Sequence, residues 1–135
     1  MSNTHEHSLT IGLIGILRKL GLKVKTKNDN RIHIQRDLEL SHSEFCNLQK
    51  LRYWGLIFKV KINGVHQAGY WGLTRNGSLF LNNLIDMPKK VATQDNHKIG
   101  ESDHKVRITD FYRNYTEEVW QMDFKGINFE QPSLF

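Results

Sequence analysis

The chain has 135 residues and a formal net charge of +5 at pH 7, and this length suits one domain with a small appendage, whose core needs no disulfide or metal. The sequence argues against three classes of protein. No apolar run is long enough to span a membrane, and the polar N-terminus does not resemble a signal peptide. Cys46 is the only cysteine, which excludes a framework of internal disulfides. These features are typical of a cytoplasmic protein without an internal disulfide framework.

The first predicted element is a helix from Ser8 to Leu20. Ser8 is the expected N-cap, and Gly21 is expected to end the helix. Gly12 and Gly15 would let another helix approach closely, either within the domain or across a dimer interface. The apolar residues that recur at helical spacing are Leu9, Leu13, Ile16, Leu17 and Leu20.

A basic segment and a short strand are expected next. Lysines alternate with other residues over 23–27, as in a strand edge or a basic loop, and residues 28–30 (Asn-Asp-Asn) are expected to form a turn. Apolar and polar side chains alternate over 31–35, which predicts a strand.

The strongest helix signal begins at Ser41. Glu44 stands three positions later and completes a capping box, in which each side chain accepts a hydrogen bond from the backbone N–H of the other residue. We therefore predict a helix over residues 42–54, ended by Gly55 in the left-handed conformation.

This predicted helix has a polar and basic outward face. At helical spacing, Ser43, Asn47 and Lys50 point away from the apolar side. Asparagine and lysine side chains hydrogen-bond DNA base edges or phosphates. The face is therefore a candidate contact for nucleic acid.

A β-hairpin and a second helix follow. Residues 58–62 alternate apolar with basic side chains, an Asn-Gly pair forms a turn, and residues 70–73 return as the second strand. Thr74 is the expected N-cap of a helix whose apolar residues continue as far as Ile85, where a Met-Pro pair would stop it.

Residues 40–85 together resemble a winged helix-turn-helix domain. The resemblance lies in the segments LQKLRYWGLI, from Leu48, and GYWGLTRNGSLFL, from Gly69, which stand on either side of the basic hairpin. In MarR-type regulators and related phage or plasmid winged-helix proteins, the recognition helix ends in an L-x-x-x-G-L-I pattern, and an L-T-x-x-G turn follows the wing. These patterns fall here on residues 51–57 and 73–77, and the resemblance covers about a third of the chain.

The resemblance implies an α+β winged-helix fold, in which helices pack with a small antiparallel β wing, and a DNA-binding role in transcription regulation. The recognition helix would enter the major groove, while the basic wing would touch the phosphate backbone or the minor groove. The pattern also requires a helper helix, either a single turn between Gln35 and Ser41 or a helix within residues 22–36. A two-fold dimer is the usual way in which such a domain reads a palindromic site.

The residues expected to contact DNA come from this helix and wing, where positive charge also gathers. Residues 18–61 hold eleven Lys or Arg and four Asp or Glu, whereas residues 91–135 hold five and eight. A solvated basic surface is the plain alternative. Two of the set, Arg52 and Arg75, would either clamp phosphates or brace the wing. The full set is His42, Ser43, Asn47, Lys50, Arg52, Lys59, Lys61, Asn63, His66 and Arg75.

Beyond residue 88 the sequence changes character, so we divide the chain into a winged-helix domain, 1–88, and a C-terminal region, 89–135. A β-hairpin is expected from Val91 to Thr109, with a turn-rich stretch over 96–103. Dense aromatic residues with two glutamates then indicate a short helix near 111–122, in an acidic tail.

The last five residues, QPSLF, resemble the pentapeptide with which bacterial polymerases and repair proteins bind the replicative sliding clamp. The resemblance implies that Gln131 is a polar anchor and that Leu134 and Phe135 fill an apolar pocket. Pro132 stands where many such peptides have Leu. A frayed C-terminus is the alternative.

No motif indicates an enzyme, a cofactor or a metal. The sequence has no glycine-rich phosphate loop, G-x-S-x-G elbow or H-E-x-x-H helix. His5 and His7 could share a metal but lack cysteine partners. Glu117 and Glu118 are adjacent, so they point in different directions and make a poor acid and base pair.

The sequence therefore predicts a sequence-specific or general duplex DNA-binding protein of a bacterium, phage or plasmid, without a cofactor. The alternative is a winged helix that holds another protein, as in a phage accessory or inhibitor protein, since fold alone does not fix function. Salt separates the two hypotheses, because phosphate contacts weaken steeply as salt rises and aromatic protein contacts do not.

Overall fold

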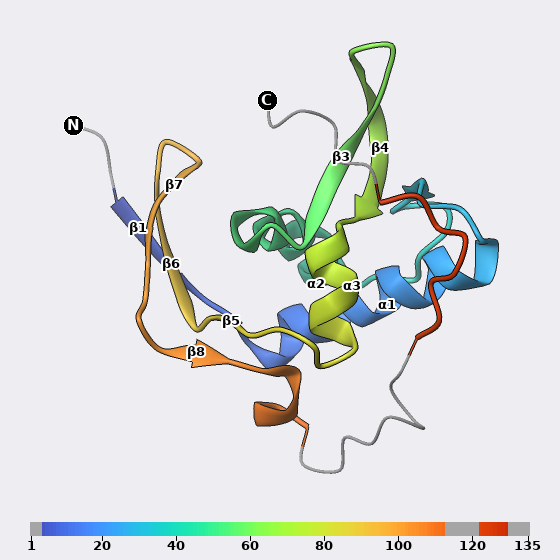
Figure 1. Cartoon of the computed structure of the whole chain (residues 1–135). Helices are drawn as coiled ribbons and strands as arrows, with labels where there is room; N and C mark the ends of the chain where they lie inside the picture. The colour runs from blue at the N-terminus through green and yellow to red at the C-terminus, as the bar shows by residue number, and fades with distance from the viewer. Residues whose placement is uncertain (1–3, 113–121, 130–135) are drawn as a thin grey trace.

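The computed structural model describes residues 4–112 and 122–129, and within them the fold is mixed α+β, with three α-helices and antiparallel sheets (Figure 1). None of these helices is both long enough and apolar enough to cross a membrane. The elements, in chain order, are β1 (Thr4–Ser8), α1 (Ile11–Lys27), β2 (Ile32–His33), α2 (His42–Leu48), the 3₁₀ helix η1 (Gln49–Trp54), β3 (Ile57–Ile62), β4 (Val65–Leu73), α3 (Arg75–Leu81), β5 (Met87–Pro88), β6 (Lys90–Gln94), β7 (His97–Glu101), β8 (Lys105–Val106) and the 3₁₀ helix η2 (Ile108–Asp110).

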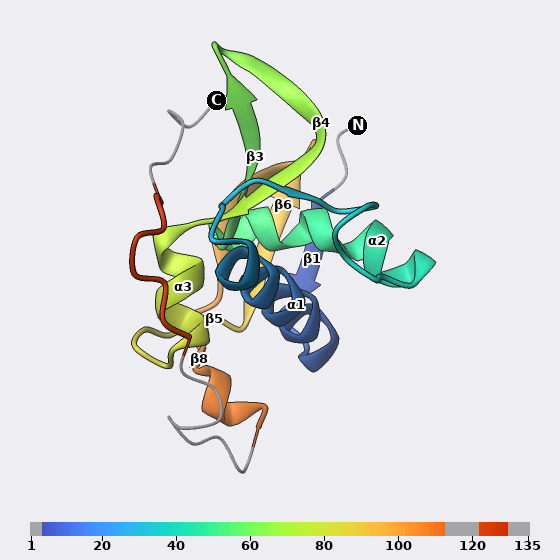
Figure 2. The same ribbon diagram turned by 90° about the vertical axis from the view of Figure 1, so that its right-hand side faces the viewer.

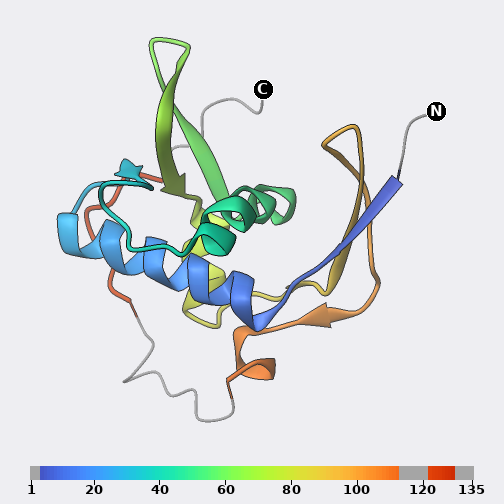
Figure 3. The same ribbon diagram turned by 180° about the vertical axis from the view of Figure 1, so that it is seen from behind.

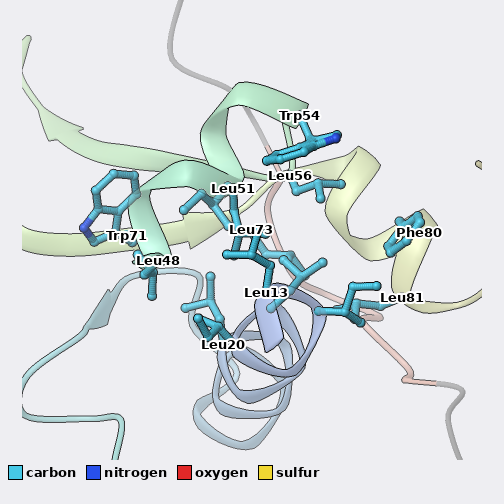
Figure 4. Close-up of a cluster of buried hydrophobic side chains, with 14 of the residues drawn as sticks. Leu13, Leu20, Leu48, Leu51, Trp54, Leu56, Trp71, Leu73, Phe80 and Leu81 are labelled. Atoms are coloured by element: carbon cyan, nitrogen blue, oxygen red, sulfur yellow. The ribbon is translucent and has the colours of Figure 1, made fainter. Parts of the chain in front are cut away.

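Helix α1 is the centre of the hydrophobic core. Its buried residues meet apolar side chains from α2, β4 and α3, and α1 lies between α2 and α3 (Figures 2 and 4). The Thr10 side chain caps the helix by accepting a hydrogen bond from the Leu13 N–H at 3.2 Å. The predicted cap at Ser8 is therefore wrong, and Ser8 instead ends β1.

The same helix continues past Gly21, where the sequence predicted its end. A Cβ at Gly21 would lie 2.7 Å from Leu81 Cδ1, so the missing side chain permits close packing against α3 instead of stopping the helix. The helix ends at Lys27, and Asn28 follows in the left-handed conformation with a φ of 52°. The expected strand edge or basic loop over 23–27 is therefore part of α1.

The first sheet has the strand order β2-β4-β3 and is antiparallel throughout. Strands β3 and β4 form a hairpin that projects from the body (Figures 1 and 3), and the Asn63-Gly64 turn that the sequence predicted has positive φ at both residues. The pairing of Ile57 with Leu73, both buried, fixes the base of this hairpin in the core. The predicted strand over 31–35 is confirmed only at residues 32–33, which form β2, and residues 34–37 form a turn.

Both ends of the helix predicted over 42–54 are confirmed. The capping box between Ser41 and Glu44 is present, and Gly55 is left-handed with a φ of 70°. The interior differs from the prediction, because α2 ends at Leu48 and the chain continues as the 3₁₀ helix η1.

This change of helix type follows from the spacing of the buried side chains. Residues three apart fall on one side of a 3₁₀ helix, and Leu48, Leu51 and Trp54 have this spacing and are all buried. Trp54 also donates a hydrogen bond from Nε1 to the Pro88 carbonyl oxygen at 2.8 Å. The prediction of one α-helix is therefore wrong from residue 49 onward.

Helix α3 begins as predicted, with Thr74 as its N-cap. The Thr74 Oγ1 accepts a hydrogen bond from the Gly77 N–H at 2.9 Å, and a Cβ at Gly77 would collide with the Leu56 carbonyl oxygen. The L-T-x-x-G pattern thus has a packing reason. The helix ends at Leu81, earlier than predicted, because Asn83 turns the chain with a φ of 58°.

The second sheet, of order β1-β6-β7, combines an early strand with two late ones. Strand β1 pairs along its whole length with β6, so the pairing crosses the boundary predicted at residue 88. Strands β6 and β7 form a hairpin inside the range predicted for one, 91–109, but it turns early, at Asp95 and Asn96. The predicted return strand over 105–109 is wrong, because residues 105–106 form β8, which pairs with β5. The stretch predicted as turn-rich, 96–103, is mostly strand β7, because backbone pairing with β6 does not require apolar side chains.

The predicted short helix near 111–122 falls largely outside the described residues, and so does the pentapeptide from Gln131 to Phe135. Residues 122–129 are described. They contact the core through Met122, Phe124 and Phe129.

Asn30 connects three parts of this fold. Its side chain is buried, and its Nδ2 donates hydrogen bonds to the carbonyl oxygens of Leu73 at 2.8 Å and Asn128 at 3.0 Å. Its Oδ1 accepts a hydrogen bond from the Leu73 N–H at 2.7 Å. Because Leu73 is fully buried, its main-chain groups depend on this amide for their hydrogen bonds.

Replacing Asn30 by Ala should lower the free energy of unfolding by about 2–3 kcal/mol, because the Leu73 N–H would be buried without a partner. Urea denaturation followed by circular dichroism measures this change. Asn76→Ala, at an exposed asparagine of α3, is the control. A loss for Asn30→Ala no larger than that of the control would contradict the role of the amide.

Candidate nucleic-acid interface

The candidate interface surrounds α2 and η1. The β3–β4 hairpin lies on one side of this segment and the β1-β6-β7 sheet lies on the other (Figures 1 and 3). The β3–β4 and β6–β7 hairpins project in the same direction. A large partner that approaches from this side would meet the β3–β4 hairpin as well as α2 and η1.

The β3–β4 hairpin carries four of the predicted contact residues. Asn63 is the first residue of the turn, Lys61 is the strand partner of His66, and Lys59 lies nearer the core. The Lys59 Nζ lies 5.6 Å from the centre of the Trp71 ring. Among the ion pairs between described residues, none involves Lys59 or Lys61. Within the described part of the chain, the hairpin therefore presents positive charge that no carboxylate neutralises at ion-pair distance.

The structure brings Ser43, Asn47 and Lys50 together on one face, as helical spacing predicted. The Asn47 Nδ2 donates a hydrogen bond to the Ser43 Oγ at 3.4 Å. This face lines a groove of about 390 Å³, which β1 and the start of α1 also line. Strand β1 therefore limits how closely a duplex can approach these side chains.

His42 is exposed at the start of α2 and does not line this groove. Its Nε2 lies 3.6 Å from the Sγ of Cys46, one helical turn away. The two predicted arginines each lie over an aromatic ring. Arg52 lies over Tyr53, at 5.4 Å from the ring centre, and Arg75 lies over Phe129, at 5.7 Å, so neither ring belongs to the β3–β4 hairpin.

A polar and aromatic cluster, which the sequence did not predict, is formed by β2, the turn that follows it, and β4. The Arg36 Nη2 donates a hydrogen bond to the Tyr70 hydroxyl at 2.6 Å, and the His33 ring meets the Tyr70 ring edge-on with 5.0 Å between centres. The alternation of a strand contained a signal for this cluster, since Trp71 is buried and its neighbour Tyr70 has to face the other side. Arg36 is exposed and adds positive charge near β4.

Carboxylates close to α1 are already paired. Lys19 and Glu44 form an ion pair at 2.9 Å, and Lys27 and Asp37 form one at 3.0 Å. Hydrogen bonds from backbone N–H groups, and then from these lysines, lower the pKa of both carboxyl groups. The carboxylates of Glu44 and Asp37 are thus neutralised by lysines of α1 and not by the hairpin lysines.

His7 joins β1 to η1 at the edge of the groove. Its ring stacks on Tyr53 with 5.2 Å between centres, and its Nε2 lies 2.9 Å from the Thr93 Oγ1. Burial, and then the positive charge of Lys50 and the neighbouring His5, lower the pKa of His7. The folded chain therefore favours the neutral imidazole.

Within the described part of the chain, no three His, Cys, Asp or Glu side chains are grouped so as to hold a metal ion. No protein-family model, curated protein or solved structure matches the chain. The side chains of the interface offer cations, amides and imidazoles, which suit an anionic partner that carries phosphate groups.

Lowering the pH from about 7 to about 5 should decrease the free energy of unfolding, and His7 should account for part of the decrease. Because its pKa is lowered on folding, the unfolded chain binds a proton at a pH at which the folded chain does not. The contribution of His7 to the free energy of unfolding is therefore complete when the pH is above the ordinary histidine pKa of 6.5. It is lost as the pH falls through the lowered pKa of His7 in the folded chain.

Urea titrations across this pH range should give a shallower pH dependence for His7→Gln than for the wild type. His66→Gln, at an exposed position of β4, is the matched control. Identical pH dependence in the wild type and His7→Gln would show that the contacts of His7 do not depend on its protonation.

Proposed function

We propose that the protein binds duplex DNA as a winged-helix module, with the β3–β4 hairpin as its wing. The order of the elements supports this proposal. Helix α1, strand β2, helix α2, η1 and the hairpin follow one another as in a winged helix-turn-helix, and the strand order β2-β4-β3 pairs the wing with the strand after the first helix. In this arrangement α2 stands in the place of the helper helix and η1 in that of the recognition helix.

The observation that carries the proposal is the charge of the projecting hairpin. Lys59 and Lys61 stand on it without a carboxylate partner among the described ion pairs, and Arg36 is exposed near its base. Lysines that meet DNA phosphates release condensed counterions, which favours binding at low salt. A projecting cationic hairpin can reach the phosphate backbone without any rearrangement of the core.

The form of η1 favours general duplex binding over reading of a long base sequence. Six residues of 3₁₀ helix span about 12 Å. The polar face of Ser43, Asn47 and Lys50 lies in the groove beside β1. We therefore assign most of the affinity to phosphate contacts, which position a protein on DNA, and a smaller share to base edges.

The affinity for random-sequence duplex DNA should fall steeply as salt rises. Lys59→Ala and Lys61→Ala should each weaken binding and should each reduce the slope of log affinity against log salt by about 1, the value for one lost phosphate contact. Fluorescence anisotropy of a labelled duplex, measured across a salt series, gives both quantities.

Lys98→Ala is the matched control for these variants, because Lys98 is an exposed lysine of β7 that is ion-paired with Glu101 at 2.7 Å. It should bind like the wild type. Absence of wild-type binding even at low salt would overturn the proposal. If the slope of log affinity against log salt is the same for all three lysine variants, the hairpin lysines do not contact the DNA.

A second candidate function is docking on another protein, and the position of Phe129 favours it. The Phe129 ring contacts the core, and its centre lies 5.7 Å from that of Phe124. The chain is thus anchored two residues before Gln131, where the QPSLF sequence begins. We propose that this pentapeptide docks on a bacterial sliding clamp, with Gln131 as the polar anchor and Leu134 and Phe135 as the apolar one.

A pulldown with purified sliding clamp should recover the wild type in larger amount than a Leu134→Ala, Phe135→Ala double variant. Ser133→Ala lies inside the same pentapeptide and should be recovered like the wild type. Moderate salt should change recovery little, because apolar anchors carry the contact. Equal recovery of the double variant would discard clamp docking and would leave the DNA proposal untouched.

A further inference from the structure

The tip of the β3–β4 hairpin exposes two apolar side chains. Ile62 is 42% exposed and Val65 is 63% exposed, and they are strand partners on either side of the Asn63-Gly64 turn. Neither belongs to the core cluster, whereas Ile57, at the base of the same strand, does. Packing within the described residues therefore gives no reason for an apolar pair at this tip.

Cationic and polar side chains stand directly behind the apolar pair. The next strand partners are Lys61 and His66, and Lys59 follows closer to the core. Each residue of a strand advances by about 3.3 Å, so Lys59 lies about 10 Å behind the tip. The hairpin thus presents first an apolar edge and then positive charge.

The minor groove of duplex DNA matches this arrangement, because its innermost part offers bases and its outer rims carry negative charge. It is about 6 Å wide and about 7.5 Å deep, with phosphates along both rims and stacked bases at its floor. With the apolar pair at the floor, Lys61 would lie about 3 Å and Lys59 about 10 Å above it, so the rims, at about 7.5 Å, would fall between the two lysines. The charge behind the tip therefore selects a polyanion as the partner, in preference to an apolar pocket on a neutral protein surface.

We propose that Ile62 and Val65 form an apolar wedge that enters the minor groove of duplex DNA and partly unstacks one base step. The proposal rests on the DNA-binding function proposed above and assigns to it a second kind of contact. Lysines that contact phosphates hold the hairpin on the duplex. The wedge packs against the unstacked bases and makes no hydrogen bonds to their edges.

The width of the hairpin determines what the wedge does to the duplex. Two paired strands lie about 4.8 Å apart between backbones, and their side chains add to this width. The groove therefore has to open, and proteins that insert apolar side chains there bend the duplex toward the major groove. A duplex with a weakened base step should bind more tightly, because less stacking is lost on insertion.

The test compares the full chain with an Ile62→Ser, Val65→Ser double variant. Both positions are exposed, so the variant should fold, and thermal melting by circular dichroism checks this. Leu84→Ser is the matched control, since Leu84 is 62% exposed and follows α3. The probes are a random-sequence duplex and the same duplex with one central T·T mismatch, each labelled at both ends with a fluorescence energy-transfer pair.

The wild type should bind the mismatched duplex about tenfold more tightly than the matched duplex, and it should bring the two ends closer together. The double variant should lose this preference and the bending. Its dependence on salt should stay that of the wild type, because Lys59 and Lys61 are retained. Leu84→Ser should match the wild type in every measurement.

A double variant that keeps the mismatch preference and the bending would overturn the wedge while leaving the proposed DNA binding in place. Absence of wild-type binding to either duplex would overturn both proposals. A third arm uses vesicles that contain phosphatidylserine. Tighter wild-type binding to these vesicles than to DNA, lost in the double variant, would overturn DNA as the partner and assign the tip to an anionic membrane.

Discussion

The side chain of Asn30 supplies Leu73 with a partner for both of its main-chain hydrogen-bonding groups, as a neighbouring strand would. Leu73 ends β4 and Thr74 begins the cap of α3, so this amide fixes the point at which the projecting hairpin leaves the core and the last α-helix starts. The same Nδ2 reaches the Asn128 carbonyl oxygen and holds a late segment over this junction. Any rotation of the hairpin relative to α1 would break buried hydrogen bonds, which makes such a rotation costly.

Because the core end of the β3–β4 hairpin is fixed in this way, only the outer half of the hairpin is free to meet a partner. That half carries Lys61 and the apolar tip, and Lys59 lies just behind it on β3. The carboxylates of Glu44 and Asp37 are held by lysines of α1. The polar face of α2, in contrast, is turned toward β1. The proposed interface therefore divides its roles, with phosphate contacts and groove insertion on the hairpin and a lesser contribution from α2 and η1. A rigid hairpin also loses little conformational entropy when it binds.

Features with a local cause could be predicted from the sequence. The capping box at Ser41, the left-handed Gly55 and the Thr74 cap each depend on residues a few positions apart, and all three are confirmed. The errors have distant causes. Gly21 does not stop α1 because Leu81 of α3 packs against it. The candidate site likewise has a part that could be predicted and a part that could not. Helical spacing placed Ser43, Asn47 and Lys50 on one face, but nothing nearby in the sequence indicated that β1 would lie beside them. Nor did the alternation of β3 show that the hairpin extends beyond the core and exposes Ile62.

The pairing of β1 with β6 constrains the order in which the chain can assemble. His7 and Thr93, in contact across these strands, are 86 positions apart, and the entropic cost of closing a loop grows with its length. Helix α1 and the β3–β4 hairpin use contacts between near neighbours, which form fast, whereas pairing between distant segments is slow. Tyr53 and Lys50 would therefore be uncovered until β6 is available to hold β1 in place. The groove beside α2 takes its shape only when these two remote parts of the chain meet, so a ribosome-bound chain that lacks β6 would expose the Tyr53 side of η1 to solvent.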